Sequence, residues 1–167
     1  MKKFFANTIC FLTLVLLLFS CREERNPYPI PICHVDILIR LDGFDMGFGA
    51  GRMKTFNYTR GHAGCYGSLQ YWNMGFRGGV VVLNMGGGEF LAYDMACPND
   101  HWHGCTVVEF ISDGGTRVIP DYFECSCCKT KFNILSGQPM AGSQTRYSMR
   151  SYHVTPITGG TQFRVHN

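Results

Sequence analysis

Charged side chains are scarce in this sequence, and neither sign prevails. Of the 167 residues 16% are charged, with 15 lysines and arginines against 12 aspartates and glutamates, and the net charge is +3. Two of the positive charges, Lys2 and Lys3, lie in a segment that we expect to be removed. Nucleic-acid binding requires a basic face that neutralises phosphates. The composition therefore gives no support for a nucleic-acid partner.

The sequence also lacks helical periodicity and the common catalytic motifs. No long segment repeats its apolar residues with a clean 3.6-residue period. There is no Gly-x-Ser-x-Gly or His-Glu-x-x-His motif, and the glycines at 86–88 are not followed by the lysine of a phosphate-binding loop. We therefore do not expect an enzyme that acts alone.

The apolar run at the start of the chain is short for a membrane span. It covers residues 9–19, follows two lysines and ends at a small residue, Ser20, which is typical of an export signal. The stretch Leu-Phe-Ser-Cys at 18–21 resembles the lipobox of bacterial lipoproteins, which implies cleavage before Cys21 and lipidation of that cysteine. An uncleaved N-terminal anchor is the alternative. Either way, we expect the chain in the bacterial cell envelope, outside the cytoplasm.

The remainder of the chain has the length of about one domain. Residues 21–31 are charged and then rich in proline, which is typical of a tether. We therefore expect a signal peptide over 1–20, a tether over 21–31 and a single domain over 32–167. Lipid at Cys21 would be its contact with the membrane, which we expect to be the outer membrane. The domain would lie in the periplasm or at the cell surface.

Short β-type segments separated by glycine turns follow the tether. Residues 35–41 alternate apolar and polar side chains, as in a strand with one buried face. Three hairpins are expected, around the turns 85–88, 112–115 and 158–160, where glycine tolerates positive φ. Residues 43–51 have the composition of an irregular loop. The sequence thus predicts an antiparallel β-sandwich or small barrel.

Nine cysteines are present, and five of them fall within residues 97–128. Cys10 leaves with the signal, and Cys33 and Cys65 stand apart, either paired with each other or buried as apolar side chains. Clustered cysteines in an oxidising compartment usually form disulfides. With Cys21 lipidated, seven thiols remain, so at least one is left for a metal, a partner or burial.

Four blocks of sequence then occur in the order found in one family. They are 97–105 (CPNDHWHGC), 125–132 (CSCCKTKF), 136–142 (SGQPMAG) and 149–154 (MRSYHV). Together they resemble a Rieske 2Fe-2S domain, over about residues 78–165. The resemblance implies a Rieske-like antiparallel β fold with two cysteine-bearing loops, each of which supplies one cysteine to one iron and one histidine to the other.

Carried over residue by residue, this pattern is incomplete. Cys97 and Cys125 match the two ligand cysteines. Asn99 and Cys128 fall where the family has its two ligand histidines, and an asparagine amide is a poor iron ligand. The family's remaining two cysteines form a disulfide that braces the loops, and the matching residues here are Cys105 and Cys127.

Other metals and thiol chemistry must be weighed beside this resemblance. His101 or His103 together with Cys97, Cys125 and Cys128 would supply three thiolates and one imidazole, a set that zinc accepts. A thioredoxin-like dithiol at 125–128 is disfavoured because a strand, rather than a helix, is expected beside it.

Our expectation is a disulfide-braced binding or structural module that has a degenerate cluster site and no cofactor. In it, Cys97 would pair with Cys125 or Cys128. The first alternative is a 2Fe-2S electron-transfer protein with a redox partner protein, and the second is a zinc-stabilised module.

Overall fold

The described part of the chain is an antiparallel all-β fold. The computed structural model describes residues 29–56, 75–76, 78–100, 103–109 and 115–167. Within these ranges no helix is long and apolar enough to cross a membrane. The expected signal peptide, Cys21 and most of the expected tether lie outside the described residues.

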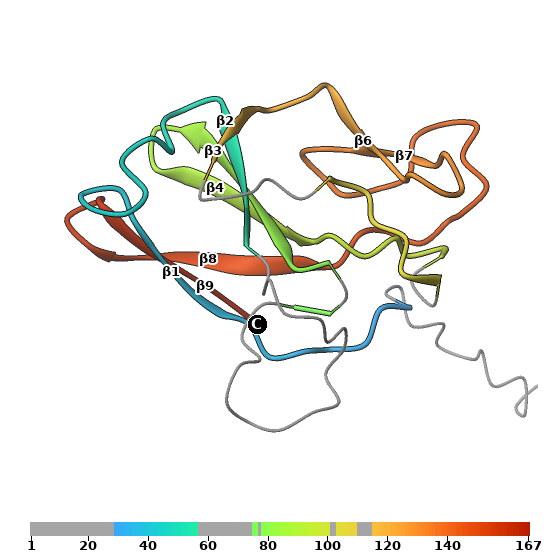
Figure 1. Cartoon of the computed structure of the whole chain (residues 1–167), viewed down its shortest axis with the longest axis horizontal. Coiled ribbons are helices and arrows are strands. Elements are labelled where there is room, and N and C mark those ends of the chain that lie inside the picture. Colours follow the sequence, from blue (N-terminus) through green and yellow to red (C-terminus); the bar gives the residue numbers. More distant parts are fainter. Residues whose placement is uncertain (1–28, 57–74, 77, 101–102, 110–114) are drawn as a thin grey trace, which may run out of the picture.

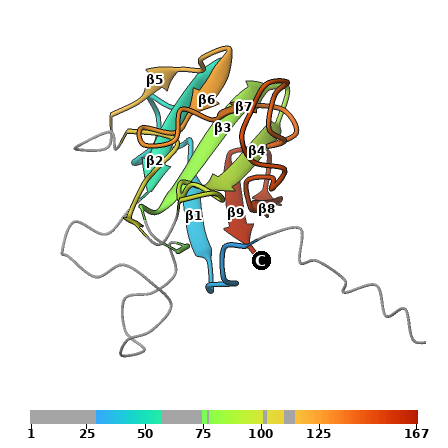
Figure 2. The ribbon, with the colours of Figure 1, turned by 90° about the vertical axis from the view of Figure 1, so that its right-hand side faces the viewer.

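The larger sheet has seven strands in the order β1-β9-β8-β4-β3-β2-β5. Its strands are β1 (Asp36–Arg40), β2 (Arg52–Phe56), β3 (Val80–Gly86), β4 (Glu89–Asp94), β5 (Arg117–Val118), β8 (Ser151–Thr158) and β9 (Gln162–His166). All neighbouring strands run antiparallel. The sheet curls into a half-barrel, with β1, β8 and β9 at one side and β2, β3 and β4 at the other (Figures 1 and 2).

Strand β3 shows how both faces of this sheet are covered. Its residues Val80, Val81, Val82 and Leu83 have no exposed surface. Val80 and Val82 pack inside the curl, with side chains from β1, β4, β8 and β9. Val81 and Leu83 point to the opposite face, where the cysteine-bearing segments cover them. Because successive side chains of a strand point to opposite faces, an uninterrupted apolar run is suited to this doubly covered position.

A two-stranded sheet carries the second cysteine loop. It consists of β6 (Tyr122–Glu124) and β7 (Lys131–Asn133), in which Phe123 lies opposite Phe132. Both rings are buried against the outer face of the large sheet. Figure 1 shows this unit beyond one end of the curled sheet. The two phenylalanines therefore fix the position of the loop between them.

Most of the expected strands are present. Strand β1 forms where the alternation at 35–41 predicts it, and β3–β4 and β8–β9 are the first and third expected hairpins. Most of the turn of the second expected hairpin lies outside the described residues, and β5, which follows it, pairs with β2. Strand β2, which begins at Arg52 directly after the irregular loop expected at 43–51, was not predicted from the sequence.

Candidate metal centre

The first cysteine loop runs from Cys97 to Cys105 and begins three residues after the last residue of β4, Asp94. Backbone pairing closes it at its base, where the N–H of Cys97 donates to the carbonyl of Cys105 at 2.9 Å and Ala96 forms a bridge with Thr106. The Cys97 side chain is fully buried. The backbone N–H groups of Asn99 and Asp100 point to its sulfur. Such amide donors stabilise a thiolate.

The buried carboxyl of Asp94 anchors this loop from below. Its Oδ1 accepts from the N–H of Ala96 at 2.9 Å, while Oδ2 accepts from the N–H of Phe76 at 2.6 Å and from the Tyr152 hydroxyl at 2.7 Å. Complete burial raises the pKa of Asp94 to about 6, although these hydrogen bonds and nearby Arg150 oppose the rise. Hydrogen bonds from three segments thus fix Asp94, which lies three residues before the loop.

The second loop joins β6 to β7 and turns sharply after Cys128. The next residue, Lys129, has a φ of 57°, and it is the single non-glycine residue with positive φ in the described ranges. Its N–H donates to the carbonyl of Cys125 at 3.1 Å, while the N–H of Cys125 donates to the carbonyl of Thr130 at 2.9 Å. This turn brings Cys125 and Cys128 to the same side of the loop.

A disulfide joins the two loops. The sulfurs of Cys105 and Cys127 are 2.05 Å apart and their Cα atoms 5.9 Å apart, which is ordinary disulfide geometry. This pairing is the one that the Rieske resemblance implies. Cys33 is also disulfide-bonded, whereas Cys65 lies outside the described residues.

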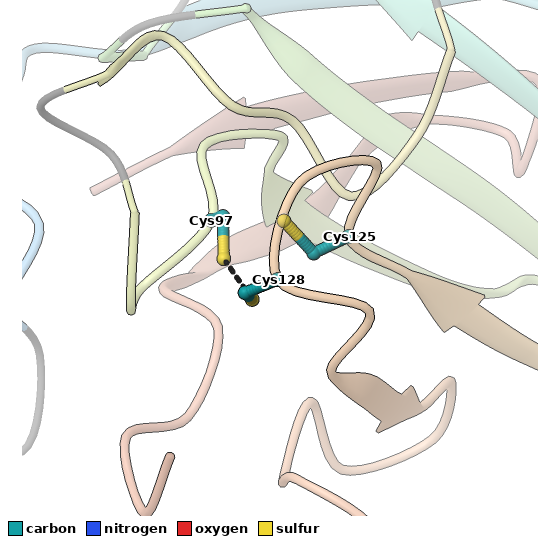
Figure 3. Close-up of side chains that lie close together, drawn as sticks. All are labelled: Cys97, Cys125 and Cys128. Atoms are coloured by element: carbon teal, nitrogen blue, oxygen red, sulfur yellow. Dashed lines mark hydrogen bonds between the residues drawn. The ribbon is translucent and has the colours of Figure 1, made fainter. Parts of the chain in front are cut away.

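Three thiols meet between the braced loops. The sulfurs of Cys97, Cys125 and Cys128 all lie within 4.8 Å of one another, and those of Cys97 and Cys128 are 3.6 Å apart (Figure 3). All three are free thiols, so the further disulfide expected from Cys97 to Cys125 or Cys128 is not formed. Cys97 and Cys125 are buried and Cys128 is partly exposed. Sequence neighbours from two loops thus become one compact group of sulfurs.

The thiols differ in how easily they ionise. Burial, followed by the contact with Cys125, raises the pKa of the Cys97 thiol far above its ordinary value. Partial burial acts in the same direction on Cys128, but hydrogen bonds from the side chain and backbone of Thr130, and then from the other two thiols, outweigh it and lower the pKa of Cys128. The Cys128 sulfur and the Thr130 hydroxyl oxygen are 3.2 Å apart. Cys128 therefore ionises more readily than Cys97, and a cation beside the two sulfurs would favour the thiolate form of both.

Of the two histidines expected as alternative ligands, the structure describes only His103, which lies apart from this group. His103 is 79% exposed and its Nδ1 is 3.1 Å from Oδ1 of Asp100, while His101 lies outside the described residues. Asn99, at the family's first histidine position, lines an open polar pocket of about 480 Å³. The other residues that line this pocket are Ser143, Gln144, Thr145, Arg146 and Tyr147. In the described residues, no imidazole joins the three sulfurs.

This donor set does not match a Rieske cluster. Such a cluster needs two donors on each of two irons, with histidines on one of them. Here the described donors are three sulfurs in a single compact group, and an amide occupies the first histidine position. A single metal ion held by three sulfurs requires only that the sulfurs of Cys97, Cys125 and Cys128 lie close together, as they do. The residues therefore fit a single ion better than the two-iron cluster.

Sequence reasoning missed the residues that support the thiols. Thr130 follows the Cys-x-x-Cys spacing by two positions, but only the turn at Lys129 places it against Cys128. From the sequence, Asp94 looks like an ordinary polar residue at the end of a strand. In the structure it is buried and accepts hydrogen bonds from Phe76 and Tyr152, which are distant in the sequence. The one available signal was an acidic residue three positions before a ligand cysteine.

Comparison with known proteins gives little more. No family model matches the chain, and no curated protein matches it. Among solved structures, a chain from the complex of reduced oxygenase and oxidized ferredoxin in carbazole 1,9a-dioxygenase is 18% identical to this one, with a TM-score of 0.45. The match covers 79% of this chain and 93% of that chain. A likeness this weak carries no inference about function.

Proposed function

We propose that this protein is an exported, lipid-anchored Rieske-like domain that holds one metal ion, zinc in the first instance, on Cys97, Cys125 and Cys128. In this proposal it is a binding or structural module of the cell envelope and has no enzymatic activity of its own. The observation that supports it is the convergence of three sulfurs within 4.8 Å. Two thiolates on a tetrahedral zinc, with Zn–S of about 2.3 Å, lie about 3.8 Å apart. The Cys97–Cys128 separation of 3.6 Å is close to that value.

The surroundings of the sulfurs are also those of a metal site. Cys97 and Cys125 are buried, and Cys128 opens towards solvent, which leaves a path for the ion. The disulfide between Cys105 and Cys127 fixes the two loops relative to each other before any ion arrives. Preorganised thiols lose less conformational entropy on binding, so the same three sulfurs hold an ion more tightly.

Metal analysis of anaerobically purified protein tests this proposal. We expect about one zinc per chain, no acid-labile sulfide and no visible colour. Substitution of Co²⁺ for zinc should then produce thiolate-to-cobalt absorption bands, which report the number of sulfur ligands. Metal-free protein in which Cys97 is disulfide-bonded would contradict the proposal and favour the module closed by disulfides alone.

Variants locate the ion within the loops. Cys97→Ser and Cys128→Ser should each weaken zinc binding at least about tenfold, because each removes one of three strong ligands. Ser126→Ala is the matched control, since Ser126 lies in the same loop between two proposed ligands and is exposed. Its zinc affinity should stay within about twofold of wild type. Equal losses in all three variants would indicate damage to the loop instead of loss of a ligand.

A 2Fe-2S electron-transfer centre with a redox partner protein is the second candidate. The observation in its favour is the Cys105–Cys127 disulfide, which joins the loops as the Rieske resemblance implies. The same purification separates the two candidates. A brown protein with iron and sulfide in equal amounts would favour the cluster and exclude the single zinc.

The location of the protein is a separate part of the proposal. The export signal over 1–20 and the lipobox at 18–21 support lipid attachment at Cys21. Metabolic labelling with a radioactive fatty acid should mark the wild-type protein, and Cys21→Ser should abolish the label. A labelled Cys21→Ser variant would contradict attachment at this residue. An impermeant reagent applied to intact cells would then distinguish the surface from the periplasm.

A further inference from the structure

Ligand-type side chains form a row across three strands, on the face of β1, β9 and β8 that points away from the core. His166 in β9 lies opposite Asp36 of β1 on one side and opposite His153 of β8 on the other. Paired residues of antiparallel strands project from the same face. Their neighbours Val165 and Ile37 are buried in the core, so the row points outward. Figure 1 shows β1, β8 and β9 together at one side of the fold.

The two histidines of this row are close enough to share an ion. Their ring centroids are 5.7 Å apart, with planes tilted by 36°. Two imidazoles on one tetrahedral ion, with metal–nitrogen bonds of about 2.0–2.1 Å, have centroids about 5 Å apart. Rotation of exposed side chains supplies the remaining few tenths of an ångström without any backbone movement.

His34 adds a third imidazole at the same edge. It is exposed and stands two residues before Asp36, so strand alternation places both on the outward face. Both His34 and His166 act electrostatically on the Asp36 carboxylate. His34 and His166 thus both lie near the Asp36 carboxylate, while His153 pairs with His166 from the other side of β9.

Asp36 supplies the negative charge of this surface. Arg164 donates to it from two nitrogens, at 2.7 and 2.6 Å, which fixes the carboxylate in place. A carboxylate has lone pairs beyond the two that Arg164 uses. It can therefore accept the second ring N–H of a metal-bound histidine, which is the usual arrangement around metal-ligating imidazoles.

We propose that His153 and His166 bind a divalent transition-metal ion at the sheet surface, independently of the three cysteines. The ions concerned are those that imidazole ligands suit, namely Ni²⁺, Cu²⁺ and Zn²⁺. The cysteine group is soft and mostly buried, whereas this site is exposed and nitrogen-based. The chain would then carry two metal sites of different chemistry.

Nickel titration of the full-length protein in detergent, loaded beforehand with a single equivalent of zinc for the cysteine site, tests this site. Substoichiometric Ni²⁺ should broaden the ring-proton NMR signals of His153 and His166 before that of His103, which is exposed but lies apart. Calorimetry should give a nickel affinity that falls at least about tenfold in His153→Gln and in His166→Gln. His103→Gln is the matched control and should change it by less than about twofold.

Two results would overturn this proposal. The first is broadening of all histidine signals at the same nickel concentration. The second is an unchanged affinity in His153→Gln and His166→Gln, when circular dichroism shows that both variants are folded. This test is independent of the test of the cysteine site, because Cys97→Ser and Cys128→Ser should leave the nickel affinity within about twofold of wild type. A tenfold loss in those cysteine variants would contradict two independent sites.

Discussion

Removal of the Cys105–Cys127 disulfide should destabilise the fold by an amount that follows from its loop length. The two cysteines are separated by 22 positions along the chain. In the chain-entropy model, cross-linking a loop of this size removes denatured-state entropy worth about 3 kcal/mol at 25 °C. For a domain of this size, such a loss lowers the melting temperature by about 10 °C. The perturbation is the double variant Cys105→Ala/Cys127→Ala, which leaves no unpaired partner thiol.

Urea unfolding followed by circular dichroism measures the effect. We expect a midpoint shift with a nearly unchanged slope, together with a weaker metal site, because the two thiol-bearing loops lose their common brace. Zinc should be removed from both proteins first, so that unfolding reports only the disulfide. A loss below about 1 kcal/mol in the metal-free proteins would refute the reasoning, since the loops would then be held by packing alone.

Three further predictions concern single side chains. Lys129→Gly should raise the free energy of unfolding by about 0.5–1 kcal/mol, because glycine tolerates the positive φ that lysine adopts there. Lys131→Gly is the control: Lys131 lies in strand β7, where glycine is unfavourable, so this variant should lower the free energy of unfolding by a similar amount. The raised pKa of Asp94 favours folding at low pH, so its contribution to stability is full below pH 3.8 and is lost as the pH rises through about 6. Between pH 4 and pH 7.5 in urea unfolding, the free energy of unfolding of the wild type should therefore fall by up to about 3 kcal/mol more than that of Asp94→Asn. Phe132→Ala should cost about 3–5 kcal/mol in the same assay, because the fully buried ring leaves a cavity under the second cysteine loop; a cost under 1 kcal/mol would mean that this loop does not depend on β7.

Much of the scaffold could be predicted from local patterns. The alternation in β1 and the glycine turns after β3 and β8 are short-range signals, and the strands formed accordingly. The two cysteine-bearing loops and the Cys105–Cys127 disulfide were expected because the cysteine-containing blocks of the sequence resemble those of Rieske domains. Such features could be predicted because each depends on few residues.

What sequence reasoning missed depends on partners that are distant in the chain. Strand β2 reads as polar because it contains Lys54, yet that lysine is buried, with its Nζ 2.6 Å from Oδ1 of Asp45 in the preceding turn. Strand β5 is two residues long and is defined only by its pairing with β2. Convergence of the thiols likewise required the turn at Lys129, a position where sequence propensity argues against a left-handed residue. In each case a tertiary contact outweighs the local preference.

The number of sulfurs in the central group has a consequence for its redox chemistry. A disulfide uses thiols two at a time, so oxidation of any pair among Cys97, Cys125 and Cys128 leaves the third thiol unpaired. That thiol then stays free or reacts with another molecule. A bound ion, in contrast, satisfies all three at once. In an oxidising compartment the metal and the disulfide would compete for the same sulfurs, and the ion would serve as the protecting group that keeps an odd set of thiols reduced.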